Sequence, residues 1–306
     1  MPLRWSVIRF RMQHTPIDPG TIRALLSEAE SSLAAGTHPE RARRDAEALL
    51  LQVLRQNAPD KNLAWLIAHE EATLEPVAAD ALRALIRRRR DGEPMQYITG
   101  EAEFYGLSFH VNRDVLIPRP ETEHLVEKAI ALAADFKHPR IVDVGAGSGA
   151  IAAALAYKLP AAEIYATEIS APALAVAREN AVRNGVADRV RFFARDLLAP
   201  VADEQFDIVV SNPPYVPEGD RAALSVEVRD YEPTQALFAG SDGLEVYRRL
   251  IPAAFGALVS GGFVVLEIGY GQQAAIDALL AGSGFIEVEF TADLQGIARV
   301  ATARRP

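Results

Sequence analysis

The feature that most constrains the fold is the alternation of predicted strands and helices from residue 140 onward. The expected strands cover residues 140–144, 164–167, 190–194, 206–210 and 262–268, and the expected helices cover 151–158, 171–184, 243–259 and 272–281. Two more runs of strand formers, 285–290 and 298–302, are expected to pair in antiparallel fashion. Strands that alternate with helices are typical of a parallel sheet. We therefore predict an α/β fold with a mostly parallel seven-stranded sheet.

A helical segment precedes this sheet, from residue 21 to about residue 90. Its apolar residues recur at intervals of three and four, at Ile22, Leu25, Leu26, Ala29 and Leu33 and again at Ala46, Leu49, Leu50, Val53 and Leu54. This spacing places them on one face of a helix and indicates a small helical bundle. Asp45 and Glu47 are expected on the polar side. The run Arg87–Arg90 is expected to be a solvated helix end near the last carbonyl groups.

The segment 97–117 changes to strand formers interrupted by Gly and Asn, which predicts a β-hairpin. We divide the chain into a helical domain (1–95), a hairpin linker (96–118) and a larger domain (119–306). Residues 1–15 are expected to be a disordered extension. The helical domain carries no catalytic motif and is either a stabilising cap or a docking module. Docking of a macromolecular partner is favoured, because an enzyme for small molecules would not need such a module.

The linker leads into a proline-rich turn. Thr122 is the predicted N-cap of a helix that continues through Ala134. Arg119, just before it, either forms a salt bridge or faces an anionic group of a ligand.

Composition limits the class of protein. A chain of 306 residues suits one large domain with a smaller one, and its 49% apolar and 24% charged residues are ordinary for a soluble globular protein. No apolar run is long enough to cross a bilayer, and the first residues lack the continuous apolar run of a secretory signal. The chain has no cysteine. A cytoplasmic protein without disulfides, metal site or membrane contact is therefore expected.

Charge is divided unevenly along the chain. Residues 1–95 carry 14 Lys and Arg against 13 Asp and Glu, whereas the remainder carries 18 against 28. An excess of acidic groups makes the larger domain a poor binder of phosphate backbones. Direct binding of nucleic acid is therefore not expected.

A glycine-rich loop follows the first predicted strand and opens the next helix. Its candidate cofactor-binding residues are Gly145, Ala146, Gly147, Ser148 and Gly149. Glycines let the backbone approach a ligand, and amide groups at a helix start can bond its polar groups. Glu168 ends the second strand, where it would accept hydrogen bonds from the two hydroxyls of a ribose. Asp196 ends the third strand and would accept from an adenine amine, with Leu197 flanking the ring.

A second site feature follows the fourth strand. The apolar run ends at Asn212, and the next residues, Pro213 and Pro214, cannot donate hydrogen bonds and have fixed φ angles. The side-chain carbonyl of Asn212 and the backbone carbonyl of Pro213 are two acceptors beside the ring of Tyr215. They suit a flat group with an NH2, such as a carboxamide or the exocyclic amine of a base. These four residues are the candidate catalytic residues.

Taken alone, the glycine loop also fits a nicotinamide dinucleotide site. Two features favour S-adenosylmethionine instead. Asp143 lies at the end of the first strand, where it can orient the glycine loop or the methionine amine. The acceptors at Asn212 form a second anchor, for which a dinucleotide enzyme has no need. Asn212 is therefore also a candidate cofactor-binding residue.

The residues quoted so far resemble those of class I S-adenosylmethionine-dependent methyltransferases that act on planar NH2 nitrogens, through Asp143–Ala150 and Asn212–Tyr215. This resemblance implies a Rossmann-like sheet. Further stretches are similar to the bacterial release factor glutamine methyltransferase family. They are Gly92-Glu93-Pro94, Tyr97-Ile98-Thr99-Gly100, Glu103-Phe104-Tyr105-Gly106-Leu107, Ile117–Glu123, Glu232-Pro233 and Ala239-Gly240-Ser241-Asp242-Gly243-Leu244. The resemblance covers about residues 20–300, and its motifs are specific in combination.

The resemblance implies transfer of a methyl group to the side-chain amide nitrogen (N5) of the glutamine in the Gly-Gly-Gln motif of peptide chain release factors. It implies that the helical domain helps to hold the release factor. The implied cofactor residues are Gly145–Gly149 and Glu168, with Leu197 near Asp196, and the implied glutamine pocket is Asn212, Pro213, Pro214 and Tyr215. In the wider superfamily Asp is also common where this chain has Glu168, and the longer side chain is not interpreted as a loss of cofactor binding. A monomer is expected.

The expected mechanism rests on placement and electrostatics. Asn212 Oδ1 and the Pro213 carbonyl accept the two amide protons of the substrate and aim its nitrogen at the methyl group, while Tyr215 packs against the amide plane. The proton can leave to solvent, so no dedicated base is required.

Three alternatives remain open at this point. Adenine-N6 methyltransferases of nucleic acid use a similar loop, because adenine presents a similar NH2 edge. A glutamine methyltransferase of a ribosomal protein would share the chemistry, and only family resemblance separates it. A non-catalytic binding protein for release factors would need neither the intact loop nor the glycines.

Overall fold

The computed structural model describes residues 20–56, 58–199, 204–293 and 295–306 of the chain. The chain splits into two compact units, with the division between Gly92 and Glu93. Each unit has its own buried apolar residues. The extension expected at residues 1–15 lies outside the described residues.

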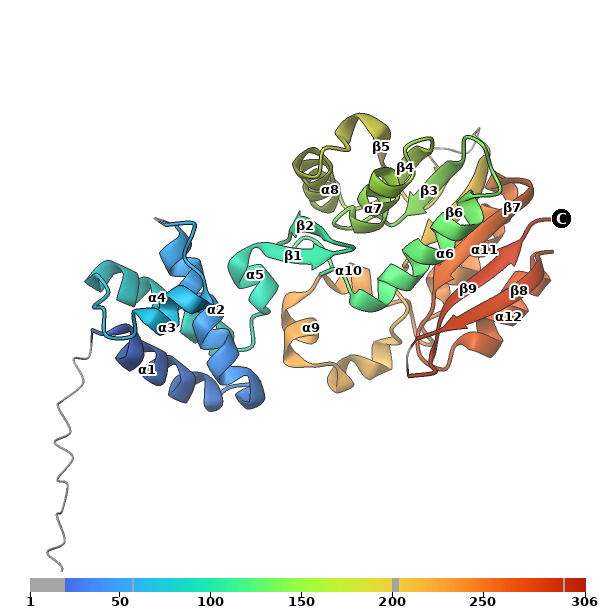
Figure 1. The fold of residues 1–306 in the computed structure, drawn as a ribbon. Coiled ribbons are helices and arrows are strands. Elements are labelled where there is room, and N and C mark those ends of the chain that lie inside the picture. The colour runs from blue at the N-terminus through green and yellow to red at the C-terminus, as the bar shows by residue number, and fades with distance from the viewer. Residues whose placement is uncertain (1–19, 57, 200–203, 294) are drawn as a thin grey trace, which may run out of the picture. The chain divides into compact units, whose positions relative to one another are not determined.

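The first unit is a bundle of helices (Figure 1). It contains α1 (Ile22–Ala34), η1 (Pro39–Arg41), α2 (Ala42–Arg55), α3 (Leu63–Ala68) and α4 (Pro76–Arg90). The hydroxyl of Thr21 caps α1 by accepting a hydrogen bond from the Ala24 amide at 3.3 Å. The apolar stripe from Ile22 to Leu33 is buried, which confirms the helical spacing. On α2, Val53 is buried but Leu54 is only half-buried.

An ion pair is buried inside this bundle. Nε of Arg89 donates to Oδ2 of Asp45 at 2.6 Å, and the two side chains are 2% and 9% exposed. The expectations of a polar surface for Asp45 and a solvated end for Arg89 are therefore wrong. Arg89 follows Leu82 and Ile86 at helical spacing, so the last turn of α4 carries it onto the buried face.

The second unit is a seven-stranded sheet preceded by a β-hairpin (Figure 1). The hairpin strands are β1 (Glu101–Phe104) and β2 (Leu107–His110), and the sheet strands are β3 (Arg140–Val144), β4 (Glu163–Glu168), β5 (Val190–Ala194), β6 (Phe206–Ser211), β7 (Leu258–Glu267), β8 (Ile286–Ala292) and β9 (Ala298–Arg304). The helices are α5 (Met95–Thr99), η2 (Pro120–Thr122), α6 (Glu123–Ala133), α7 (Ala150–Lys158), α8 (Ala171–Arg183), η3 (Ala187–Arg189), η5 (Glu218–Ala223), α9 (Val226–Tyr231), α10 (Thr234–Leu237), α11 (Glu245–Ala257) and α12 (Gln273–Gly282).

The strand order in the sheet is β5-β4-β3-β6-β7-β9-β8. The first five strands in this order run parallel, and β9 pairs antiparallel with both β7 and β8. The predicted mostly parallel sheet with a closing antiparallel pair is confirmed. The chain proceeds outward from β3 through β4 to β5 and then returns to the other side of β3 with β6. Open α/β sheets bind ligands at the carboxyl ends of the strands where such a switch occurs.

The residues of β6 enter two separate cores, as expected for a strand buried on both faces. A register shift between Phe206 and Ile208 interrupts their strict alternation. Ile208 and Val210 belong to the core that includes α6, α7 and α8, whereas Phe206 and Val209 belong to the core that includes α11 and α12. Helices therefore cover both faces of the sheet. This arrangement leaves the carboxyl ends of the strands as the place for a site.

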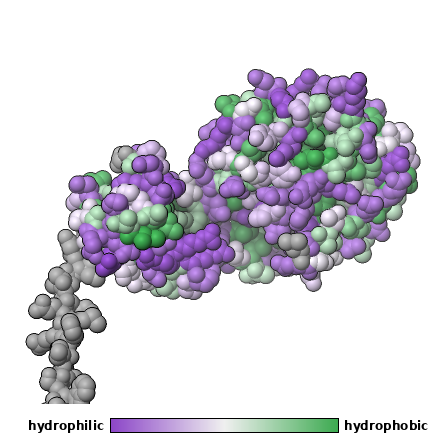
Figure 2. All heavy atoms as spheres, in the orientation of Figure 1, coloured by the Kyte–Doolittle hydropathy of each residue, from purple (hydrophilic) through white to green (hydrophobic). Residues whose placement is uncertain are grey.

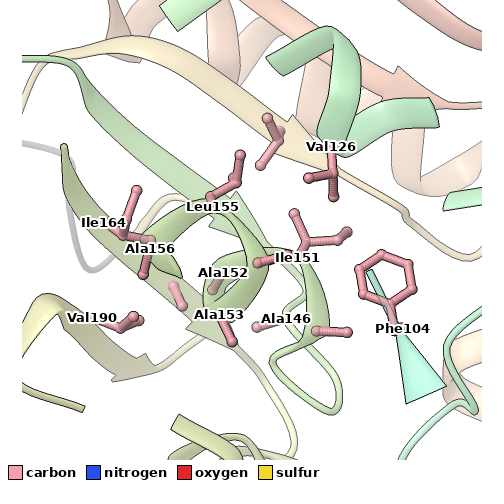
Figure 3. Packing of buried hydrophobic residues seen from close by; sticks show 14 of the residues in the cluster. Phe104, Val126, Ala146, Ile151, Ala152, Ala153, Leu155, Ala156, Ile164 and Val190 are labelled. Carbon is pink, nitrogen blue, oxygen red and sulfur yellow. The ribbon is translucent and has the colours of Figure 1, made fainter. Parts of the chain in front are cut away.

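Small side chains let α7 lie close to its neighbours. All residues from Ala150 to Ala156 are buried, and only Ile151 and Leu155 among them are larger than alanine. Figure 3 shows these two side chains pointing into the core from α7, near Val126 of α6 and Ile164 of β4. The tight packing fixes the start of α7 and therefore the glycine loop before it.

Several details differ from the predicted elements. The first residues of the predicted hairpin, 97–99, belong to helix α5 instead. The helix expected over 243–259 ends at Ala257, and Val259 belongs to β7 instead. The short helices η5, α9 and α10 lie between β6 and α11, where no element was predicted, because so few residues per helix carry no clear period. On the face of this unit that Figure 2 presents, hydrophilic residues surround smaller hydrophobic groups. No helix within the described ranges has the length and hydropathy to cross a membrane.

Candidate active site

A cavity of about 360 Å³ opens at the carboxyl ends of the central strands of the second unit. Cavities of this size hold small ligands and cofactors. The predicted site residues that line it are Gly145, Ala146, Gly147, Ser148, Glu168, Asp196, Leu197, Asn212, Pro213 and Pro214. Gly149 and Tyr215 are not among the described residues that line it. The fold thus brings the glycine loop, the two acids and the Asn-Pro-Pro segment to one place.

The glycines of the loop have two different functions in the structure. Gly145, Gly147 and Gly149 all have positive φ angles, of 78°, 54° and 78°. A Cβ added at Gly145 or Gly147 would meet no described protein atom within 4 Å, whereas one at Gly149 would lie 3.0 Å from Cβ of Ala177. Gly149 therefore serves the close packing of the loop on α8. The first two glycines keep the cavity open for a ligand.

Asp143 supports the start of α7, directly after the glycine loop, and is not among the residues that line the cavity. Its side chain is fully buried on β3, and its Oδ2 accepts a hydrogen bond from the amide of Ala152 at 3.1 Å. Burial raises the pKa of Asp143 to about 7. Of the two roles expected for this residue, orientation of the loop and helix start fits its position. A contact with a methionine amine stays a prediction, and Oδ1 of Asp143 is buried with no hydrogen-bond partner among the described residues.

Glu168 holds the loop from the end of β4. Its Oε2 accepts from the amide of Gly147 at 2.9 Å, and its Oε1 accepts from the amide of Ser170 at 2.8 Å. Each carboxylate oxygen has a second lone-pair site, so both can also accept from the two hydroxyls of a ribose. The position at the rim of the cavity therefore fits the sugar of a nucleoside cofactor.

The next predicted residues follow the end of β5. Asp196 and Leu197 both line the cavity, and Leu197 has a positive φ of 47°. Oδ2 of Asp196 accepts from Arg249 of α11, a residue that the sequence analysis did not single out. An adenine amine at Asp196 would share that carboxylate with the guanidinium.

Asn212 is oriented by a residue far away in the sequence. Its Nδ2 donates to Oγ1 of Thr122 at 3.1 Å, which leaves its Oδ1 for another donor. The hydroxyl of Thr122 in turn donates to Oε2 of Glu267 at 2.6 Å. Thr122 occupies the N-cap position of α6, as predicted, but within the described residues its side chain makes no capping hydrogen bond to this helix.

Glu267 is the bonding partner of Thr122, and the sequence analysis did not identify it. It ends β7, its side chain is buried, and the hydroxyl of Tyr215 lies 3.4 Å from its Oε1. Burial raises the pKa of Glu267 to about 7. The available signal was an acid that closes an apolar strand, which is the same signal that identified Glu168. The ring of Tyr215 packs against the core that contains Leu266.

A further ion pair fixes the rim of the cavity. Arg119, which lines the cavity, donates to Oε2 of Glu232 at 2.5 Å, and the Glu232 side chain is 1% exposed. Burial raises the pKa of Glu232, while Arg119 opposes the rise. Arg119 thus forms the salt bridge that was one of its two expected roles. Among the described residues no group of three or more His, Cys, Asp and Glu side chains could hold a metal ion.

The sequence and the fold have counterparts among known proteins. Residues 122–228 match the family described as Methyltransferase small domain, and residues 24–100 match the PrmC N-terminal domain. The chain resembles in fold the hMettl16 catalytic domain solved with an RNA hairpin, with a TM-score of 0.55 and 18% identity over 84% of this chain and 93% of that one. Together the fold and site define a class I S-adenosylmethionine-dependent methyltransferase.

Relatives at higher identity define the family. The chain is 41% identical to the release factor glutamine methyltransferase of Geobacter sulfurreducens, over 93% of this chain and 96% of that protein. It is 44% identical to the release factor glutamine methyltransferase of Moorella thermoacetica, over 86% and 91%. The chain therefore belongs to the family of release factor glutamine methyltransferases. The family predicted from the sequence motifs is confirmed.

Proposed function

We propose that this chain methylates the side-chain amide nitrogen (N5) of the glutamine in the Gly-Gly-Gln motif of peptide chain release factors. The names of its relatives support this substrate. One observation of the site supports the chemistry: Asn212 lies at the cavity with its Nδ2 bonded to Thr122, so its Oδ1 can accept from a substrate NH2.

In this proposal the residues of the chain position the substrate amide for the reaction. When bound, S-adenosylmethionine supplies a methyl group that its sulfonium sulfur already activates. Asn212 Oδ1 and the Pro213 carbonyl accept the two amide protons of the glutamine, which fixes the nitrogen and stabilises the positive charge that develops there. The rigid Pro213-Pro214 segment keeps both acceptors at fixed positions.

Gly145–Gly149, Glu168, Asp196 and Leu197 form the proposed cofactor site. The fit is best at Glu168, whose oxygens can accept ribose hydroxyls, and at Gly145 and Gly147, where a side chain would enter the cavity. Arg249 bonds Oδ2 of Asp196, and Oδ1 accepts the adenine amine in this proposal. In this proposal Tyr215 supports the pocket without lining it, because its ring packs against the apolar core.

The proposal extends to partners and location. The helical domain, residues 1–95, docks the release factor, and the protein works as a monomer in the cytoplasm. The excess of Asp and Glu after residue 95, 28 against 18 Lys and Arg, supports a protein substrate over nucleic acid.

The test is incubation with methyl-labelled S-adenosylmethionine and a purified release factor. Label should enter the intact factor and should not enter a factor whose Gly-Gly-Gln glutamine is changed to alanine. A ribosomal protein and an adenine-containing RNA serve as rival acceptors in parallel reactions. Label in either rival but not in the release factor would overturn the proposed substrate.

A further inference from the structure

Three side chains form a continuous hydrogen-bonded relay that starts at the cavity wall, which Asn212 and Thr122 line, and ends at Glu267. Asn212 Nδ2 donates to Thr122 Oγ1 at 3.1 Å, and Thr122 Oγ1 donates to Glu267 Oε2 at 2.6 Å. The relay joins three separate elements, namely the loop after β6, η2 and the end of β7. Thr122 is 4% exposed and Glu267 is 2% exposed, so water does not compete for these bonds.

We propose that Thr122 and Glu267 are positioning residues for the reaction, because the Glu267 carboxylate sets which end of the Asn212 amide faces the substrate. The inference rests on the proposed function. A carboxylate only accepts hydrogen bonds, and the Thr122 hydroxyl has one proton to give. That proton goes to Glu267, so Thr122 can only accept from its other neighbour. Asn212 must then direct its NH2 to Thr122 and its Oδ1 to the cavity.

The opposite direction would block the reaction. If the group at position 267 donates to Thr122, the hydroxyl proton of Thr122 is free to go to Oδ1 of Asn212. The amide then turns over, and its NH2 faces the NH2 of the substrate, where neither group can accept. Protonation of Glu267 therefore changes which atom of Asn212 faces the cavity, although Glu267 itself does not contact the substrate.

The surroundings of Glu267 allow both protonation states. Burial raises its pKa to about 7, the Thr122 hydrogen bond and Arg299 oppose the rise, and Glu121 adds to it. The Tyr215 hydroxyl lies near its Oε1, and the Tyr247 hydroxyl donates to its backbone carbonyl at 2.6 Å. The carboxylate that keeps the relay in the productive direction should therefore be lost as the pH falls below about 7.

Substitutions at two positions test the relay with methyl transfer and cofactor affinity as separate readouts. Thr122→Ser keeps the hydroxyl and should retain kcat within about threefold, whereas the isosteric Thr122→Val should lower kcat by about tenfold or more, on the scale of a lost transition-state hydrogen bond. Glu267→Gln should lower kcat to a similar extent and remove the loss of activity below pH 7. The Kd for S-adenosylmethionine should change by less than about threefold in all three variants.

Thr302→Val is the matched control. Thr302 is also a buried threonine, on β9, and its hydroxyl has no hydrogen-bond partner among the described residues. This variant should keep wild-type kcat. If Thr122→Val also keeps it, the proposal is overturned. If Glu267→Gln does not fold, as judged by its melting curve, the contrast between Thr122→Ser and Thr122→Val decides.

A readout without substrate separates the relay from the proposed function. In protein labelled with ¹⁵N-asparagine, the side-chain NH2 signal of Asn212 is assigned by its loss in Asn212→Ser. This signal should shift in Thr122→Val and Glu267→Gln but not in Thr302→Val. If it shifts while the wild type fails to methylate a release factor, the relay stands and the substrate is wrong. If methylation occurs and neither the signal nor the rate responds, the relay is wrong and the function stands.

Discussion

The side chain of Asn212 offers one acceptor and two donors, and Thr122 takes one of the donors. The remaining acceptor, Oδ1, is the atom that can hold a flat NH2 in the cavity. The adjacent prolines fix the backbone, so the second acceptor, the Pro213 carbonyl, cannot rotate away. At the scale of residues, the proposed site consists of two acceptor oxygens and of the residues that hold them in place.

The first prediction concerns Asn212 itself. Asn212→Ala removes the acceptor and should reduce kcat for methyl transfer by more than about tenfold. Affinity for S-adenosylmethionine should fall less, because the glycine loop and Glu168 remain. Steady-state kinetics together with calorimetric titration of the cofactor give both quantities. An equal loss in both would contradict the assigned role.

The second prediction concerns Asp143 and pH. Its pKa is about 7 in the folded chain against 3.8 as the ordinary value, so between these values the folded state binds a proton that the unfolded state has released. Stability should therefore fall as the pH rises from about 4 to about 7, by at most about 1.4 kcal/mol per pH unit for this group. Asp143→Asn stays neutral and should flatten the curve. Urea unfolding from pH 5 to 8 measures the slope, and an unchanged slope would refute the assignment.

At the scale of elements, single contacts hold helices and loops in place. The buried Arg89–Asp45 pair joins α4 to α2, and the Arg119–Glu232 pair joins the turn before η2 to the turn after α9. In both cases one acidic side chain is nearly inaccessible to water. Such a pair is tolerated because each charge has its partner, and loss of one partner leaves the other uncompensated.

The third prediction follows for the first unit. Asp45→Ala removes the ion-pair partner of the buried Arg89 guanidinium, and it should destabilise this unit by about 3 kcal/mol or more. Asp80→Ala is the control: Asp80 pairs with Arg83 on the surface, its side chain is 78% exposed, and its loss should change stability by less than about 1 kcal/mol. Tryptophan fluorescence during urea unfolding follows this unit, because residues 93–306 contain no tryptophan. Equal effects of the two variants would contradict the buried pair.

At the scale of the whole molecule, the chain combines a helical unit with an α/β unit that contains the proposed site. Sequence charge differs between them, and the part after residue 95 is acidic, with 28 Asp and Glu against 18 Lys and Arg. Proteins that hold nucleic acid by its backbone need the reverse balance.

The fourth prediction therefore concerns selectivity. Single-stranded RNA added in excess over the release factor should not slow methylation of the factor, and it should not accept label itself. The release factor should remain the preferred acceptor at low ionic strength, where contacts with phosphate are strongest. A filter-binding assay and a competition assay at two salt concentrations measure both effects. Strong inhibition by RNA at low salt would indicate a nucleic-acid surface.

The sequence by itself determined the features that depend on residues close together in the chain. Strand and helix periods gave the parallel sheet, glycines marked a loop that needs positive φ at Gly145, Gly147 and Gly149, and the paired prolines marked the end of β6. Acids at strand ends also identified Glu168, because a parallel sheet brings all its carboxyl ends to one edge.

Only the tertiary structure decided which side chains meet across the chain. Thr122 lies at a helix start, as expected, but its hydroxyl bonds Glu267, 145 residues away, instead of the helix. Asp45 was expected at the surface but bonds Arg89, 44 residues away. Asp196 likewise shares its carboxylate with Arg249, 53 residues away. Local periodicity fixes the face on which a residue lies. It does not fix which distant element covers that face, and burial, hydrogen-bond direction and pKa all depend on that cover.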